Sequence, residues 1–200
     1  MRCIALVAAL LLAACGAPPP PPQPDEVSRL AAAIRALGPE VDAEEAARAA
    51  RVTYTHTATL ARQYRITDPP IVHNTKVNMG LKPRGLCWHW ARDIEDRLKA
   101  EEFQTLEMHR AIADPDNALL LEHSTAIISA QGDSFNKGIV LDPWREGGRL
   151  TWVPTAQDDE YDWEARSAVM ARKLERAHGQ TVTVTDDQRL LVAGREYVPQ

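Results

Sequence analysis

The sequence is poor in cysteine and has no excess of positive charge. Its 200 residues include three cysteines, and 23 lysines and arginines stand against 28 aspartates and glutamates, for a formal net charge of −5. Because lysine and arginine dominate the binding of phosphate backbones, this balance gives no support to a nucleic-acid partner. The proportions of apolar residues (44%) and charged residues (26%) are those of one ordinary globular domain with a short appendage.

A long hydrophobic run is also missing. The apolar segment 4–12 follows Arg2 and is too short to cross a bilayer. Small residues then lead to a cysteine in Leu12-Ala13-Ala14-Cys15, an order that resembles a bacterial lipoprotein signal. We therefore predict that residues 1–14 are a signal peptide and that Cys15 carries acyl chains such as palmitate, which hold the protein on a membrane surface.

The alternatives for this segment are an ordinary cleaved signal and a poorly packed N-terminal helix. In the lipoprotein interpretation, residues 15–24 are a lipidated cysteine and a spacer, because six prolines within 18–24 favour an extended, semi-rigid chain. Gly16, rather than an aspartate, follows the cysteine, as in lipoproteins sent to the outer membrane. We expect a location in the bacterial cell envelope, on the periplasmic face of that membrane, with residues 25–200 as a single domain.

The shortage of cysteine makes Cys87 a candidate functional residue. Cys3 leaves with the predicted signal and Cys15 is acylated, so Cys87 is the remaining thiol. In an oxidising compartment spare cysteines tend to be paired, and one without an intramolecular partner is a candidate reactive thiol. The alternative is a small buried core residue, as most lone cysteines are.

Cys87 opens an amphipathic helix predicted to run to about residue 100. Pro83 and Gly85 break the preceding loop, after which apolar residues recur on one helical face and charged residues occupy the other. Cys87 belongs to the inward face. The unpaired N–H groups and the dipole at a helix N-terminus favour an anion, and therefore a thiolate.

The remaining pattern predicts an α+β fold with N-terminal helices packed on an antiparallel sheet. Helical periodicity precedes the Cys87 helix, whereas short alternating or apolar segments between turns follow it. The segment 66–84, with several prolines and glycines, is interpreted as a long loop. We expect helices at 25–37, 42–64 and 163–177, strands at 104–113, 119–130, 137–142 and 150–153, and a C-terminal hairpin of 181–185 with 189–192.

A thiolate nucleophile needs a base, and three histidines are candidates. His89 points away from Cys87 around the same helix. His109 lies on the opposite face of its strand from the apolar positions, which favours exposure to solvent or a place at the mouth of a site. His123 lies in a strand apolar enough to be central, where an imidazole needs a polar partner.

Asp142 is the candidate partner of His123. It ends the next predicted strand, and the two residues are about equally distant from a turn centred near Asp133, so antiparallel pairing would align them. The alternative is that Asp142-Pro143 simply ends a strand.

Three motifs, taken in order, resemble the transglutaminase-like, papain-fold family. Gly85-Leu86-Cys87-Trp88-His89-Trp90-Ala91 fits the pattern G-x-C-x-x-x-A, and Glu122-His123-Ser124 followed by Leu141-Asp142-Pro143-Trp144 is similar to that family's His and Asp strands. The resemblance covers residues 80–154. It implies a papain-like core, no cofactor, and a triad of Cys87, His123 and Asp142 for acyl transfer from, or hydrolysis of, a peptide or protein amide.

The resemblance leaves the second oxyanion donor open. The Cys87 backbone N–H would be one donor, but papain-type enzymes carry a glutamine shortly before the nucleophile, and no glutamine lies between Gln63 and Cys87. The alternatives are His73, Asn74 and Asn78. Trp88 and Trp144 are expected to line the substrate site.

Two other classes remain open at this stage. One is a catalytically inactive module of the same fold that holds a peptide or cell-envelope partner in its cleft. The other is a metal site of Cys87, His89 and His123, which is disfavoured because a Cys-x-His pair on a helix points its ligands apart.

Overall fold

The computed structural model describes residues 19–117, 120–179, 181–185, 190–192 and 195–196. The predicted signal peptide and the lipidation site Cys15 lie outside these residues, as do 16–18 of the predicted spacer. Within the described ranges, none of the helices combines the length and the apolar character needed to span a bilayer.

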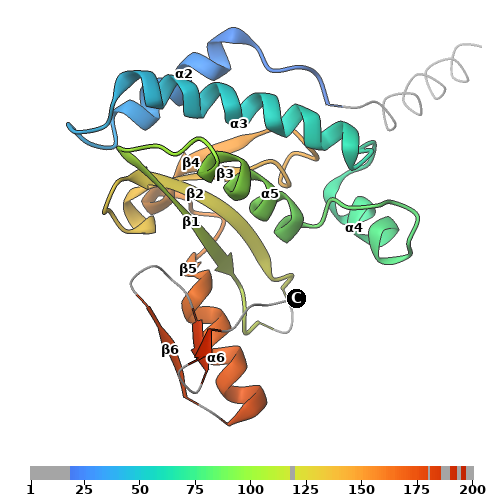
Figure 1. The fold of residues 1–200 in the computed structure, drawn as a ribbon. Helices are drawn as coiled ribbons and strands as arrows, with labels where there is room; N and C mark the ends of the chain where they lie inside the picture. The colour runs from blue at the N-terminus through green and yellow to red at the C-terminus, as the bar shows by residue number, and fades with distance from the viewer. Residues whose placement is uncertain (1–18, 118–119, 180, 186–189, 193–194, 197–200) are drawn as a thin grey trace, which may run out of the picture.

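Helices cover one face of a five-stranded sheet (Figure 1). The three predicted N-terminal helices are confirmed as α2 (Pro24–Arg35), α3 (Ala43–Gln63) and α5 (Cys87–Lys99). Helix α5 lies between α3 and the sheet, and its apolar face enters the main core. That core joins the helices to the sheet through buried side chains that include Leu30, Ile34, Ile94, Leu98, Ile128 and Leu141.

The sheet is antiparallel throughout and has the strand order β4-β3-β2-β1-β5. The predicted α+β class and the four predicted strands are therefore confirmed, and β5 is a further short strand. Two 3-10 helices, η1 (Phe135–Lys137) and η2 (Thr155–Gln157), follow β2 and β4. The strand bounds are β1 Leu106–Ala113, β2 His123–Ala130, β3 Ile139–Asp142, β4 Thr151–Pro154 and β5 Glu164–Ala165.

The prediction of a continuous loop over 66–84 is wrong, because a helix, α4 (Pro70–Asn78), lies within it. Pro70 occupies the first helical position, where a missing N–H costs nothing. Ile71 and Val72 are exposed while His73 is buried, so this helix has no apolar stripe that sequence periodicity could reveal.

A small C-terminal unit completes the described chain. Helix α6 (Arg166–His178) packs on a three-stranded sheet of β6 (Val182–Val184), β7 (Leu190–Val192) and β8 (Arg195–Glu196). The predicted helix and hairpin are confirmed, although residues 186–189 of the connection lie outside the described residues. Strand β8 was not predicted, and Figure 1 shows this unit on the side away from α2 and α3.

Candidate active site

Cys87 is the first residue of α5 and faces inward, as predicted. Its side chain belongs to the main core and only 8% of the residue is exposed. The thiol donates to the carbonyl oxygen of Glu122, with 3.8 Å between sulfur and oxygen. Helix α5 thus brings the thiol to the start of β2.

His89 holds the first turn of α5 in place. Its Nδ1 accepts hydrogen bonds from the backbone N–H groups of Gly85 and Leu86, each at 3.2 Å. Burial, reinforced by the nearby Arg84 cation, lowers the pKa of His89 to about 4, so the ring is neutral and can accept these bonds. This side chain caps the helix and is not a base for Cys87.

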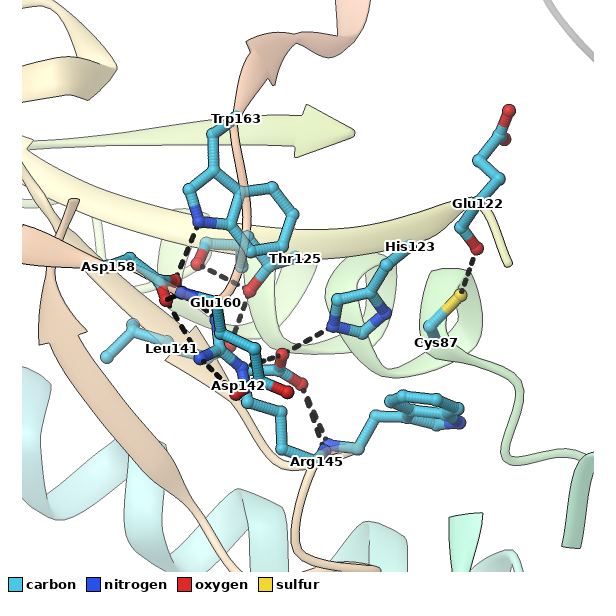
Figure 2. Close-up of polar contacts among 12 residues, drawn as sticks. Cys87, Glu122, His123, Thr125, Leu141, Asp142, Arg145, Asp158, Glu160 and Trp163 are labelled. Atoms are coloured by element: carbon cyan, nitrogen blue, oxygen red, sulfur yellow. Dashed lines mark hydrogen bonds and ion pairs between the residues drawn. The ribbon is translucent and has the colours of Figure 1, made fainter. Parts of the chain in front are cut away.

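His123, the first residue of β2, contacts Asp142 directly. Its Nε2–H donates to Oδ2 of Asp142 at 2.6 Å, and both side chains are 1% exposed. The other ring nitrogen, Nδ1, is buried without a hydrogen-bond partner among the described residues. Figure 2 shows the imidazole lying between the Asp142 carboxylate and the Cys87 side chain. This arrangement places Nδ1 on the side of the ring that faces Cys87 (Figure 2).

Although their side chains are hydrogen-bonded, His123 and Asp142 are diagonal rather than paired positions of β2 and β3. Strands β2 and β3 pair Ala126 with Leu141, so the predicted alignment of residue 123 with residue 142 is wrong by two positions. The 3-10 turn η1 lies in the connection and shifts its centre away from the predicted one. Because Asp142 is the last residue of β3, its side chain still reaches His123.

The Asp142 carboxylate accepts four hydrogen bonds. Oδ1 accepts from the backbone N–H groups of Trp144 at 3.0 Å and Arg145 at 3.4 Å, and Oδ2 accepts from His123 and from Nε of Arg145 at 2.9 Å. Burial opposes the charge, but His123 and Arg145 outweigh it and lower the pKa of Asp142. Asp142 therefore stays ionised and fixes the orientation of the imidazole.

Arg145 is a residue of the site that the sequence analysis missed. Its guanidinium also bonds Asp158 at 2.5 Å and 3.1 Å and the exposed Glu160 at 3.3 Å (Figure 2). It lies over the ring of Tyr161, 4.6 Å from the centroid. The one signal in the sequence was an arginine three residues after Asp142, within the same turn.

Three aromatic rings surround His123. The ring centroids of Trp144, Tyr161 and Trp163 lie 4.7, 4.6 and 5.5 Å from that of the imidazole. Trp144, predicted as a wall of the site, is buried against His123, whereas Trp88 is 43% exposed and packs on His89. Tyr161 and Trp163 were not predicted as site residues; the sequence pattern placed Trp163 at the start of a helix, whereas that helix begins at Arg166.

The electrostatic environment favours a protonated His123. Burial alone would lower the pKa of His123, but the Asp142 carboxylate and, to a smaller extent, the Cys87 side chain outweigh burial and raise it to about 9. A positive imidazolium beside the sulfur stabilises a thiolate.

His109 does not lie at the mouth of a site, so this prediction is wrong. It is 4% exposed, and its Nε2 lies 2.8 Å from the hydroxyl oxygen of Ser129. Its face of β1 is covered by a second apolar cluster that includes Phe135 and Trp163, which the strand alternation could not show.

Helix α4 is fixed to both sides of the site. The buried His73 donates from Nε2 to the carbonyl oxygen of Arg84 at 2.9 Å, just before the Cys87 turn. Asn74 accepts at Oδ1 from Nε1 of Trp144 at 3.0 Å. Asn78, the third alternative donor, is exposed at the end of the helix.

Comparison of the chain with protein-family models, with curated proteins and with solved structures finds no match. Within the described ranges, no three or more histidine, cysteine, aspartate or glutamate side chains are grouped in a way that could hold a metal ion.

Proposed function

We propose that this chain is a membrane-anchored thiol enzyme of the transglutaminase-like, papain-fold class, which transfers or hydrolyses the acyl group of a peptide or protein amide. The observation that carries the proposal is the buried 2.6 Å bond between His123 and Asp142, with the second imidazole nitrogen unpartnered on the side of Cys87. Support for the anchor comes from the sequence around Cys15 alone, so lipidation stays a prediction.

Each residue of the triad has one role in the proposed reaction. The proton of the Cys87 thiol rests on Nδ1 of His123, the thiolate attacks the carbonyl carbon of the amide, and Asp142 stabilises the imidazolium. When the tetrahedral intermediate collapses, the C–N bond breaks and the amine leaves with that proton. Water or a second amine then attacks the thioester, with His123 as the base, which gives hydrolysis or transfer respectively.

The low exposure of Cys87 favours one second candidate, a catalytically inactive binding module. A thiol that is 8% exposed and donates to the Glu122 carbonyl must turn before it can meet a substrate. The large apolar side chains Trp88, Leu120 and Leu121, which flank Cys87 and Glu122 in the sequence, are exposed and would line the approach for either function.

Acylation of Cys87 by an activated ester at neutral pH distinguishes the two candidates. We expect rapid acylation of the wild-type protein, no label at this position in Cys87→Ala, and a rate lower by roughly a hundredfold or more in His123→Ala, because the general base is lost. Mass spectrometry of the peptide containing residue 87 separates this label from any on Cys15. Equal rates for the wild type and His123→Ala would contradict the enzyme proposal and favour the binding module.

Asn74 is the side chain that best fits the second oxyanion donor. The Trp144 indole N–H can only donate, so it fixes Oδ1 of Asn74 as the acceptor and leaves the amide N–H₂ free to donate. The same indole packs on His123, and the neighbouring His73 fixes α4 to the turn before Cys87. These contacts support Asn74 over the exposed Asn78.

We predict that Asn74→Ala slows acylation of Cys87 by roughly a hundredfold, the usual cost of losing one oxyanion donor. Alkylation by iodoacetamide should be little changed, because displacement of iodide from a saturated carbon passes through no oxyanion. Asn78→Ala, on the same helix, is the matched control and should leave both rates unchanged. If both rates fell together in Asn74→Ala, the residue would be structural rather than catalytic.

A further inference from the structure

A cavity of about 500 Å³ lies between the second half of α5, the outer edge of β1 and the start of α6. Strand β5 pairs with β1 at Ala111 and Ile112. It does not cover the earlier part of β1, and the edge of that part opens to the cavity. Glu95 of α5, on its wall, lies eight residues from Cys87, which is about 12 Å along a helix axis. The cavity is therefore separate from the triad. The charged and hydroxyl side chains on its wall are Glu95, Lys99, Glu102, Glu107, Arg110, Arg166 and Ser167.

Arg110 lines this cavity as a buried cation with incomplete partners. The residue is 9% exposed, and its Nε is buried without a hydrogen-bond partner among the described residues. The nearest carboxylate oxygen, on Glu95, lies 3.6 Å from Nη1, and Glu95 is closer to Lys99, at 2.9 Å. A buried guanidinium usually needs a close, hydrogen-bonded anion. Glu95 does not supply one.

The start of α6 adds a second source of positive potential. This 13-residue helix has no side-chain cap on its first N–H groups and no acidic residue in its first turn. Such a terminus is suited to an anion. Arg166, its first residue, lies on the same wall, and burial together with this neighbouring cation lowers the pKa of Arg110 despite the opposing effect of Glu95. The hydroxyl of the buried Ser167 is one residue further along.

The carboxylates on the cavity wall have other partners or are exposed to solvent. Glu95 pairs with Lys99 through one oxygen and lies 3.6 Å from Arg110 through the other, and Glu107 accepts from the backbone N–H of Gly132 at 3.0 Å. Glu102, also on the wall, is exposed to solvent. The positive end therefore consists of Arg110, Arg166 and the α6 N-terminus.

We propose that this positive end binds the oxyanion of a small ligand, either a phosphate or a carboxylate. The guanidinium forks of Arg110 and Arg166 would each offer paired N–H donors, and the α6 N-terminus and Ser167 would supply the others. Nothing in the triad requires this site, so it stands independently of the proposed enzyme activity.

The test is the thermal stability of the full chain in phosphate, in acetate and in sodium chloride at the same ionic strength. An anion that occupies the site at a tenfold excess over its Kd should raise Tm by on the order of 3 °C relative to chloride. A rise in phosphate alone identifies a phosphate site, and a rise in acetate identifies a carboxylate site. Identical Tm values in all three salts would overturn the proposal.

Two variants locate the effect. Arg166→Gln, at a half-buried position, and Arg110→Lys should each abolish the rise. Arg176→Gln removes the same charge from the other end of α6 and should keep the rise. A rise of equal size in Arg166→Gln and in the wild type would contradict the site, even if Arg110→Lys did not fold.

Discussion

Replacing Asp142 with alanine should destabilise the fold by about 3–5 kcal/mol and should slow acylation of Cys87 by roughly 10⁴-fold. The loss of stability follows from what the carboxylate holds together. Asp142 is 1% exposed and bonds both the imidazole of His123 and the guanidinium of Arg145. Without it, two buried cationic groups face each other with no anion between them.

Asparagine should not rescue Asp142, although it has the same shape. All four groups that contact the carboxylate are donors: the N–H groups of Trp144, Arg145 and His123, and the Arg145 guanidinium. An amide has one acceptor oxygen, so its N–H₂ group would face two donors in either orientation. We therefore expect Asp142→Asn to lose both stability and acylation rate.

Glu160→Gln is the matched control for this prediction. Glu160 contacts the same guanidinium at 3.3 Å, but its side chain is 61% exposed. An exposed pair of this kind contributes about 1 kcal/mol or less. Urea unfolding of the three variants measures the difference, and a value for Asp142→Ala as small as that for Glu160→Gln would contradict the assigned role.

The elements around the site were predictable where a pattern repeats. The face of α5 that contains Cys87 was readable because its apolar positions recur at helical spacing, and β1 and β2 because they are apolar segments between turns. Helix α4 was not predictable from the sequence. It is held in place by single hydrogen bonds of His73 and Asn74, which produce no periodic pattern.

The triad residues could be predicted from the sequence, whereas the side chains that surround them could not. Cys87, His123 and Asp142 could be selected because each has an unusual chemistry for its place in the chain. Arg145, Tyr161 and Trp163 could not, because their function depends on contacts with His123 and Asp142 that only the folded chain creates. The register error of two residues came from a turn whose length the sequence does not specify.

Folding stability should fall by about 3 kcal/mol as the pH rises from about 6.5 to about 9, through deprotonation of His123. The sign follows from proton binding. The pKa of His123 is raised from 6.5 to about 9 in the folded protein, so between these values the folded chain holds a proton that the unfolded chain has released. The stabilisation is complete below pH 6.5 and is lost as the pH passes the folded value.

The other groups with shifted pKa values leave this pH window clear, and the measurement is made in Cys87→Ala because a cysteine thiol of an unfolded chain ionises at about pH 8.5, inside the window. Burial lowers the pKa values of His56, His89 and His109, so they reduce stability only below about pH 6.5. Burial raises the pKa of Tyr161 to about 12 and also raises that of Tyr64, so the tyrosines reduce stability only at higher pH.

Two variants assign the loss to His123. In the Cys87→Ala background, urea unfolding at a series of pH values should show a slope with His123 present and a nearly flat profile with His123→Gln, because glutamine carries no proton to release. His56→Gln replaces a half-buried histidine whose pKa is lowered, and it should keep the slope. A flat profile in Cys87→Ala would mean that the imidazole is neutral at pH 7. The thiol would then lack its cationic partner, and the ion-paired nucleophile proposed for Cys87 would have to be abandoned.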